Sequence, residues 1–249
     1  GRVCGGTLLD AAGDVTHVTA DLVIGADGAG STVARLVGAE TLREARHTTA
    51  VLYGYFGGRE PDGYEWWYRP GVAAGAIPTN RGHHCVFVAM TPDRLHGATP
   101  AGRAALFSKL VQEADPALAA QLAGRTPDAP LRMFGGRKGF LRQASGPGWA
   151  LVGDAGYFRD PITAHGITDA LRDAELLARA VVTGRPEEYA TVRNELSLPL
   201  FDVTDAIAAF DWSVEEVQAL HRALNQAMKR EVEHLISLET TPVIEEVLL

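Results

Sequence analysis

The sequence has 249 residues, of which 46% are hydrophobic and 22% are charged, and its formal net charge is −8. This apolar fraction excludes a disordered chain and is enough for one large domain or two small ones. The negative charge disfavours a nucleic-acid partner, and no apolar run approaches the ~20 residues that a membrane span needs. The two cysteines, Cys4 and Cys85, lie far apart and indicate free thiols in a reducing compartment, the cytoplasm.

The first part of the chain is expected to contain short strands followed by a helix. Residues 7–9 and 15–19 flank a turn and are typical of a hairpin. The apolar run at residues 21–24 predicts a buried strand that ends at Gly25. A glycine-rich turn follows, and residues 31–37 are expected to form a short helix.

The middle of the chain alternates short apolar segments with glycine and proline turns. This spacing of strands and turns, from residue 48 to residue 91, indicates an antiparallel sheet. The expected strands there cover residues 49–56, 64–69, 73–77 and 85–90, and two later strands are expected at residues 131–134 and 149–152.

Helices are expected in the second half. Thr99 as N-cap and Pro100 at the first position predict a helix to about residue 114. Residues 166–183 form an amphipathic pattern, and a capping box at residues 213–216 predicts the start of a last helical segment. The apolar stripe of the helix at 166–183 consists of Ile167, Ala170, Leu171, Ala174, Leu177, Ala178 and Val181.

The turn after the first apolar run carries the sequence GADGAGS. Gly28 and Gly30 would let the backbone approach a ligand, and the helix that follows would offer unpaired N–H groups to an anion. The turn is not a dinucleotide-binding fingerprint, because Val33 stands where a third glycine is needed and no strand with an acidic end follows. A plain strand-to-helix turn capped by Asp27 remains equally open.

A second glycine turn follows the strand predicted at residues 149–152. Asp154, directly after Gly153, can accept hydrogen bonds from the hydroxyls of a sugar-like chain. A loop with Pro161 leads to Gly166, where the start of a helix can hold a group of partial negative charge. The alternative is a simple βα turn with Asp154 as the cap.

Taken together, these turns resemble the para-hydroxybenzoate-hydroxylase-like (group A) family of FAD-dependent monooxygenases, over about residues 14–184. That family carries a GxGxxG motif near its start, a middle Asp-Gly motif (here Asp27-Gly28) and a later Gly-Asp motif (here Gly153-Asp154). GxGxxG does not occur in this sequence, which begins with Gly1. We therefore expect the C-terminal part of such a protein, without its first βαβ unit.

The resemblance implies a mixed α/β (α+β) fold. A partial FAD-binding Rossmann-like domain would contain an inserted antiparallel β-sheet substrate domain and would be followed by C-terminal helices. The implied parts are residues 1–45 (FAD-binding domain, middle part), 46–130 (substrate-binding sheet), 131–185 (return segment of the FAD-binding domain) and 186–249 (C-terminal helical region).

The resemblance also implies a reaction, in which NAD(P)H reduces FAD and one oxygen atom of O2 is transferred to an aromatic or polyketide-like small molecule. Asp154 would bind the ribityl chain, and Asp27 with Gly28 would support the pyrophosphate region and NAD(P)H docking. The backbone at Pro161 and at residues 166–168 would face the pyrimidine edge of the flavin, where the helix dipole would stabilise the reduced, anionic form. The implied cofactor-binding residues are Asp27, Gly28, Gly153, Asp154, Pro161, Gly166, Ile167 and Thr168.

Other interpretations remain open. Residues 157–159, and Thr163 where the family often has glycine, are also similar to the geranylgeranyl-reductase and halogenase branches. A flavin reductase or halogenase-type relative is therefore an alternative, as is a truncated fragment without cofactor or activity. No catalytic residue is assigned; His165 and Arg159 are candidates for a role near the flavin ring, and a surface position is the other interpretation of His165.

Metal binding is not expected, because the adjacent His83 and His84 would point to opposite sides of a strand. The aromatic strand at residues 64–69 would pack one face into the core, and its other face could line a pocket for a flat substrate. The expected partner is a small-molecule substrate, with neither nucleic acid nor membrane. The missing N-terminal segment or a second copy of the chain is a further possible partner.

Overall fold

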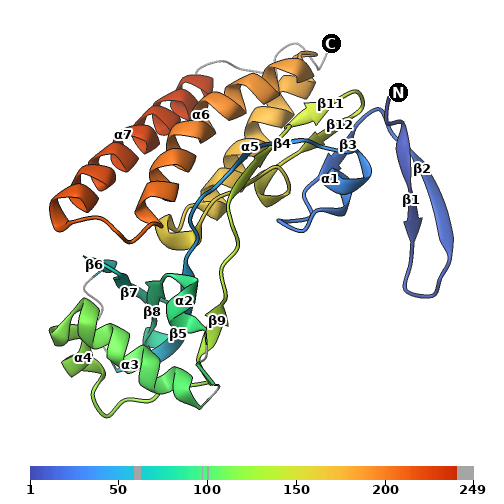
Figure 1. Cartoon of the computed structure of the whole chain (residues 1–249). Helices are drawn as coiled ribbons and strands as arrows, with labels where there is room; N and C mark the ends of the chain where they lie inside the picture. Colours follow the sequence, from blue (N-terminus) through green and yellow to red (C-terminus); the bar gives the residue numbers. More distant parts are fainter. Residues whose placement is uncertain (59–62, 97, 100, 240–249) are drawn as a thin grey trace. The chain divides into compact units, whose positions relative to one another are not determined.

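The computed structural model describes residues 1–58, 63–96, 98–99 and 101–239 (Figure 1). The chain divides into two compact units. The first unit consists of residues 1–45, 139–203 and 224–249, and the second of residues 46–138 and 204–223. Segments that are distant in sequence therefore fold together in each unit, and the helical C-terminal part contributes to both.

The described part of the first unit holds three small sheets. Strand β3 (Val23–Gly25) is parallel to β12 (Trp149–Leu151), and Gly25 lies opposite Leu151. The two glycine turns thus follow neighbouring parallel strands and leave the sheet at the same end, where β3 and β12 have their carboxyl ends. The remaining strands are β11 (Ser145–Gly146) beside β12, the hairpin β1 (Gly5–Leu9) and β2 (Val15–Thr19), and the sheet β13 (Tyr157–Phe158), β10 (Phe140–Arg142) and β4 (Thr41–Glu44).

Strand β3 lies at the edge of its sheet, in the order β11-β12-β3. The sequence predicts a buried strand at residues 21–24, but Ile24 is 50% exposed. The expectation of burial is wrong because the described chain places a neighbouring strand on only one side of β3.

In the described residues, four α-helices belong wholly or partly to the first unit. α1 (Thr32–Leu36) begins at Ser31, whose hydroxyl accepts a hydrogen bond from the Ala34 N–H at 2.9 Å. α5 (Gly166–Val182) is followed by Gly184, which has a φ of 72° and ends the helix as glycine commonly does. α6 (Pro186–Ile207) and α7 (Val214–Glu239) contribute residues to both units.

The predicted apolar stripe of α5 is only partly a core face. Leu177 is buried, at 3% exposure, but Ile167 is 81% exposed and Leu171 is 68% exposed. The first half of α5 instead buries charged side chains.

A cluster of buried charges replaces apolar packing beneath the first half of α5. Arg172, whose side chain is fully buried, pairs with Asp169 at 3.2 Å, Asp173 at 2.8 Å and Glu231 at 2.7 Å. It also donates a hydrogen bond to the Ser197 hydroxyl at 2.9 Å. Residues of α5, α6 and α7 therefore meet at one guanidinium group.

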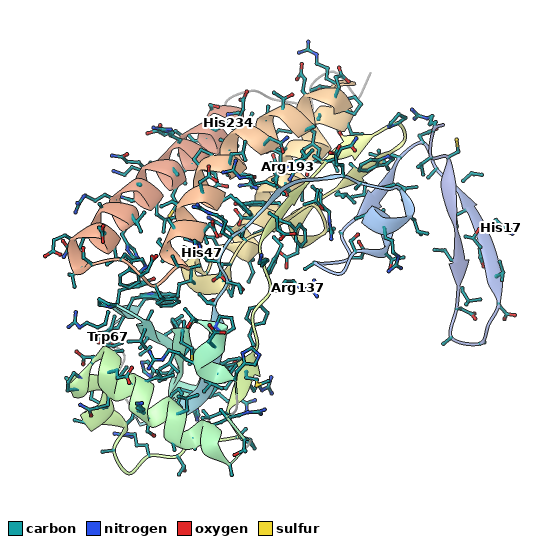
Figure 2. The ribbon with its side chains drawn as sticks, in the orientation of Figure 1. His17, His47, Trp67, Arg137, Arg193 and His234 are labelled. Carbon is teal, nitrogen blue, oxygen red and sulfur yellow. The ribbon has the colours of Figure 1, made fainter. Side chains whose placement is uncertain are left out.

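The same cluster holds the backbone near the second glycine turn. Asp173 accepts a hydrogen bond from the Gly153 N–H at 3.1 Å, and Asp169 binds Arg159 at 2.7 Å. Arg193, labelled in Figure 2, donates to the Gly156 carbonyl at 3.2 Å. The turn after β12 and the loop that follows it are thus fixed to α5 and α6 by charged groups.

The second unit is built on a five-stranded antiparallel sheet, as the sequence predicts. The strand order is β6-β7-β8-β5-β9, in which β6, β7 and β8 follow one another in sequence and β5 lies between β8 and the later strand β9. Its elements are β5 (Ala50–Gly57), β6 (Glu65–Arg69), β7 (Val72–Pro78), β8 (His83–Met90), β9 (Arg132–Phe134), α2 (Pro92–Leu95), α3 (Gly102–Ala114) and α4 (Pro116–Leu122).

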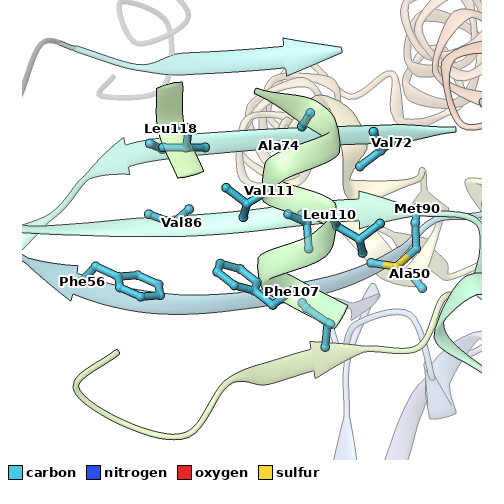
Figure 3. Packing of buried hydrophobic residues seen from close by; sticks show 14 residues of the cluster. Ala50, Phe56, Val72, Ala74, Val86, Met90, Phe107, Leu110, Val111 and Leu118 are labelled. Atoms are coloured by element: carbon cyan, nitrogen blue, oxygen red, sulfur yellow. The ribbon is translucent and has the colours of Figure 1, made fainter. Parts of the chain in front are cut away.

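Helix α3 packs on one face of this sheet and forms the core of the unit with it (Figure 3). Leu110 is fully buried, and the Phe107 ring stacks on Phe56 with centroids 5.8 Å apart. The helix spans Gly102–Ala114, and the predicted first position, Pro100, lies outside the described residues. The Thr99 hydroxyl still accepts a hydrogen bond from the Gly102 N–H at 3.1 Å.

The opposite face of the sheet is aromatic. Trp67, which is labelled in Figure 2, packs against the core, whereas Trp66 and Tyr68 stack on the other face with centroids 6.4 Å apart. Phe87 contacts Trp66 at 4.9 Å and lies over Gly75, where a Cβ atom would be only 2.3 Å from its ring. We call Trp66, Tyr68 and Phe87 the aromatic face.

Gly75→Ala tests the packing of the aromatic face. The new methyl group would overlap the Phe87 ring, so we expect a loss of about 1–3 kcal/mol in the free energy of unfolding, as in overpacked cores. The tryptophan emission should also change, because Trp66 contacts Phe87. Gly135→Ala is the control in the same unit, since its Cβ would meet nothing within 4 Å. Equal stability of the two variants in urea titrations would contradict this packing.

Arg172→Met tests the buried charge cluster. Removing the guanidinium leaves carboxylates buried without their partner, which should cost about 3–5 kcal/mol at pH 7. Burial already raises the pKa of Asp169 to about 6 and that of Asp173 above its ordinary value, despite the arginines. Carboxylates with raised pKa values stabilise the fold when protonated, so the loss should shrink as pH falls from 7 towards 5.

The control for this experiment is Arg185→Met. Arg185 pairs with Glu188 on the surface, where the two side chains are 66% and 56% exposed, so its loss should cost at most about 1 kcal/mol. The measurement is the free energy of unfolding of both variants at pH 7 and at pH 5. If Arg172→Met lowers the free energy of unfolding no more than the control does, or if its effect grows towards pH 5, the cluster does not hold α5, α6 and α7 together.

Candidate functional site

An open groove of about 720 Å³ lies in the first unit, where the turns leave β3 and β12. Its walls include the N-terminal half of α5 and the turn that follows each strand. Of the predicted cofactor-binding residues, it is lined by Gly28, Gly153, Asp154, Gly166 and Ile167. Asp27, Pro161 and Thr168 lie outside its lining.

The Asp27 side chain caps helix α1. Its carboxylate accepts hydrogen bonds from the Thr32 N–H at 2.6 Å, the Val33 N–H at 3.1 Å and the Ser31 hydroxyl at 2.5 Å. Burial alone would raise the pKa of Asp27, but these hydrogen bonds hold it below its ordinary value. The capping role, which the sequence leaves open, therefore describes this side chain.

Gly28 provides the open surface of this turn. Its φ is 76°, a conformation that glycine adopts readily, and an added Cβ would meet no atom within 4 Å. The backbone at this position is therefore accessible from the groove. The two residues of the Asp-Gly pair therefore have different roles, since Asp27 fixes the turn and Gly28 leaves room for a ligand.

The Gly-Asp turn brings Asp154 to the groove. Gly153 has a φ of 55° and lies so close to α5 that a Cβ would be 2.9 Å from the Ala170 side chain. Asp154 follows it and is half-buried. An added Cβ on Gly166 would lie 3.9 Å from the Asp154 carboxylate, so this carboxylate lies beside the first residue of α5.

The loop before α5 is held in an unusual conformation. Asp160 accepts a hydrogen bond from the Ile162 N–H at 3.0 Å and caps a short 3-10 turn (Pro161–Thr163). Ala164, which lines the groove, has a left-handed φ of 53°, which costs an L-residue about 1 kcal/mol. The His165 ring then contacts the Thr163 carbonyl through Nδ1.

The two residues proposed near the flavin ring differ in their surroundings. Arg159 has a side chain only 2% exposed and is paired with Asp169, so it lies behind the loop and outside the groove lining. His165 is half-buried, and burial together with the nearby Arg159 guanidinium holds its pKa below its ordinary value. The His165 ring is therefore neutral at pH 7.

The residues that the sequence reasoning missed are the charged ones behind the groove. Asp169, Arg172 and Asp173 are spaced at i, i+3 and i+4, so they project from one side of α5. Charges at that spacing usually indicate a solvated helix face, so the sequence gives no clear signal that this side is buried. The predicted apolar stripe lies on the other side of the helix.

The adjacent histidines His83 and His84 lie on strand β8. His83 binds Asp128 at 2.6 Å, while His84 is 1% exposed and faces the core side, so the two rings point apart. In the described ranges no group of three or more His, Cys, Asp or Glu residues could hold a metal ion. None of the helices in that part of the chain combines the length and apolar character that crossing a bilayer requires.

Comparisons with known proteins bear on this groove. Residues 4–185, which include both glycine turns, match the family described as FAD binding domain. No curated protein matches the sequence. Several solved structures share the fold at sequence identities below 20%.

The flavin-dependent brominase Bmp2 is 18% identical, with a TM-score of 0.72 over 94% of this chain and 61% of that one. Klebsiella pneumoniae HpxO, complexed with FAD and uric acid, is 17% identical, with a TM-score of 0.68 over 95% of this chain and 62% of that one. The flavin-dependent halogenase CmlS is 19% identical, with a TM-score of 0.65 over 80% of this chain and 38% of that one. The chain thus spans less than two thirds of each of these proteins.

The family match covers most of the chain, and the fold is the mixed α/β arrangement that flavin-dependent halogenases and HpxO share. The groove lies where the conserved architecture of such folds, the carboxyl ends of parallel strands, places a ligand. The chain therefore belongs to the FAD-binding domain family.

Proposed function

We propose that this chain is part of a para-hydroxybenzoate-hydroxylase-like, FAD-dependent monooxygenase that uses NAD(P)H and O2 to hydroxylate an aromatic or polyketide-like small molecule. One observation carries the proposal. The two glycine turns and the N-terminus of α5 come together around a single groove, to which Gly28 and Gly166 contribute backbone and no side chain. Backbone N–H groups at such a place suit an anionic or carbonyl-bearing ligand.

In this proposal each part of the groove has a task in binding FAD. The Asp154 carboxylate accepts a hydrogen bond from a ribityl hydroxyl, and the backbone at Gly28 supports the pyrophosphate. The N–H groups at residues 166–168 face the pyrimidine edge of the ring. When bound, FAD supplies the electron and oxygen chemistry, while these residues hold it in place and the loop at Ala164 shapes the site.

The aromatic face of the second unit supports the proposal that the substrate is a flat molecule. Trp66, Tyr68 and Phe87 present ring surfaces on the side of the sheet opposite α3, and stacking on such surfaces favours planar molecules. Burial raises the pKa of Tyr68, so its phenol stays protonated at neutral pH. His221 contacts Tyr68 with ring centroids 4.4 Å apart and completes a wall that is aromatic but carries polar groups.

A halogenase-type or reductase-type relative is the second candidate, because CmlS and Bmp2, with this fold, are a flavin-dependent halogenase and a brominase. Products formed with and without halide in the presence of FAD, NAD(P)H and O2 would separate halogenation from hydroxylation. A truncated fragment without activity is the third. Flavin content separates this possibility from the other two, since a chain that never binds FAD performs none of this chemistry.

The open edge of β3 supports a further part of the proposal, namely that another segment completes the cofactor site. Ile24 on β3 and Ile167 and Leu171 on α5 are all at least half exposed around this edge of the unit. Apolar side chains next to an unpaired strand edge are suited to cover by additional chain. We propose the N-terminal unit of the family, or a second copy of this chain, as that cover.

Asp154→Ala tests the cofactor role directly. Loss of the carboxylate leaves a ribityl hydroxyl poorly paired, so FAD should bind about tenfold to a hundredfold more weakly, or ~1–3 kcal/mol. Titration of flavin fluorescence gives the affinity, and thermal unfolding shows whether the fold is intact.

Arg35→Ala is the matched control. Arg35 is exposed on α1 and donates only to the Thr32 hydroxyl at 3.3 Å, so its removal should change FAD affinity far less. A folded Asp154→Ala protein that binds FAD as tightly as the parent would disprove the role of the Gly-Asp turn. A parent protein that binds no FAD would favour the fragment without cofactor.

A further inference from the structure

Charges of opposite sign lie at the N-terminus of α5, namely the positive end of the helix dipole and the carboxylate of Asp169. A helix N-terminus has a partial positive charge that favours an anion, yet Asp169 lies in the first turn of this helix. Its side chain is only 3% exposed, so water does not screen its charge effectively. An unpaired Asp169 would therefore weaken the attraction of the groove for negative charge.

Two arginines offset this carboxylate, but they do so differently. Arg172 is shared among three carboxylates, whereas Arg159 donates, among the described residues, to Asp169 alone, through Nε at 2.7 Å and Nη2 at 3.2 Å. In the described part of the chain the cluster balances, because three carboxylates meet three guanidinium groups. The groups are Asp169, Asp173 and Glu231 against Arg159, Arg172 and Arg193.

Arg159 also lies close to the end of α5 that faces the groove. Its charge lowers the pKa of His165, which is the N-cap residue of the helix. Its Nη1 atom is buried and makes no hydrogen bond within the described ranges, although the residue is 5% exposed. Of the guanidinium nitrogens of Arg159, Nε and Nη2 therefore face the Asp169 carboxylate, whereas Nη1 does not.

We propose that Arg159 is a positioning residue that acts through its charge. It keeps the N-terminus of α5 electropositive and so strengthens binding of a flavin that carries negative charge on its ring. The inference rests on the proposed FAD site and names a residue outside its lining. The reduced flavin, with its pyrimidine edge deprotonated, should benefit from Arg159 more than the oxidised, neutral ring. The competing explanation is that Arg159 merely tethers the loop at residues 159–166 to α5.

The experiment compares the affinity of the full chain for oxidised FAD with its affinity for FAD reduced by dithionite without oxygen. The readout is the ratio of the two dissociation constants, oxidised over reduced. Arg159→Met should lower this ratio about tenfold, which corresponds to about 1.4 kcal/mol. Arg159→Lys keeps the charge and should stay within about threefold of the parent.

Charge-balancing variants separate the field of Arg159 from its tether. The double variant Arg159→Met with Asp169→Asn removes one charge of each sign and should restore the parental ratio, although the salt bridge is gone. Asp169→Asn alone removes only the negative charge and should raise the ratio above that of the parent. This second variant keeps the test decisive if Arg159→Met does not fold, as thermal unfolding would reveal.

The outcomes distinguish the inference from the function on which it rests. If the parent binds both forms of FAD and every variant keeps the parental ratio, the proposed function stands and the role of Arg159 is overturned. The same holds if the double variant stays as low as Arg159→Met, since the tether would then explain the loss. A parent that binds neither form overturns the proposed function and this inference together.

Discussion

The pairing of Arg172 with three buried carboxylates is the interaction on which the first unit depends. A guanidinium group this deeply buried is tolerated only when its charge is matched, because desolvation costs several kcal/mol per ion. The match requires α5 to turn its charged side inward and α7 to bring Glu231 alongside. The apolar residues Ile167 and Leu171 are thereby directed outward, so one buried charge determines which side of α5 forms the wall of the groove.

Much of the fold could be predicted from local signals. The capping box is present as expected, because Ser213 and Glu216 exchange hydrogen bonds at 2.6 and 3.2 Å between side chain and backbone. The alternation of strands and turns gave the antiparallel sheet, since β6, β7 and β8 pair in the order in which they occur in the sequence. Such features depend on residues a few positions apart, which is the range over which sequence patterns are informative.

Other features depend on partners that a local pattern does not contain. The buried side of α5 could not be found from its apolar stripe, because Arg172 is paired with Glu231, 59 positions away. The exposure of Ile24 follows from the edge position of β3, which only the strand order reveals. The glycine turns located the groove, but the contacts of Asp27 were needed to show that its carboxylate is occupied by capping. The roles of the groove residues towards FAD remain predictions.

The left-handed conformation of Ala164 has a consequence for how a ligand would bind. A non-glycine residue keeps this conformation only where its surroundings impose it, and here the Asp160 cap and the His165 contact with Thr163 enclose it. The loop therefore takes its shape while the protein folds and needs no reordering when a ligand arrives. Such preorganisation spares the complex the entropic penalty of immobilising a loop, so contacts made there contribute to affinity almost undiminished.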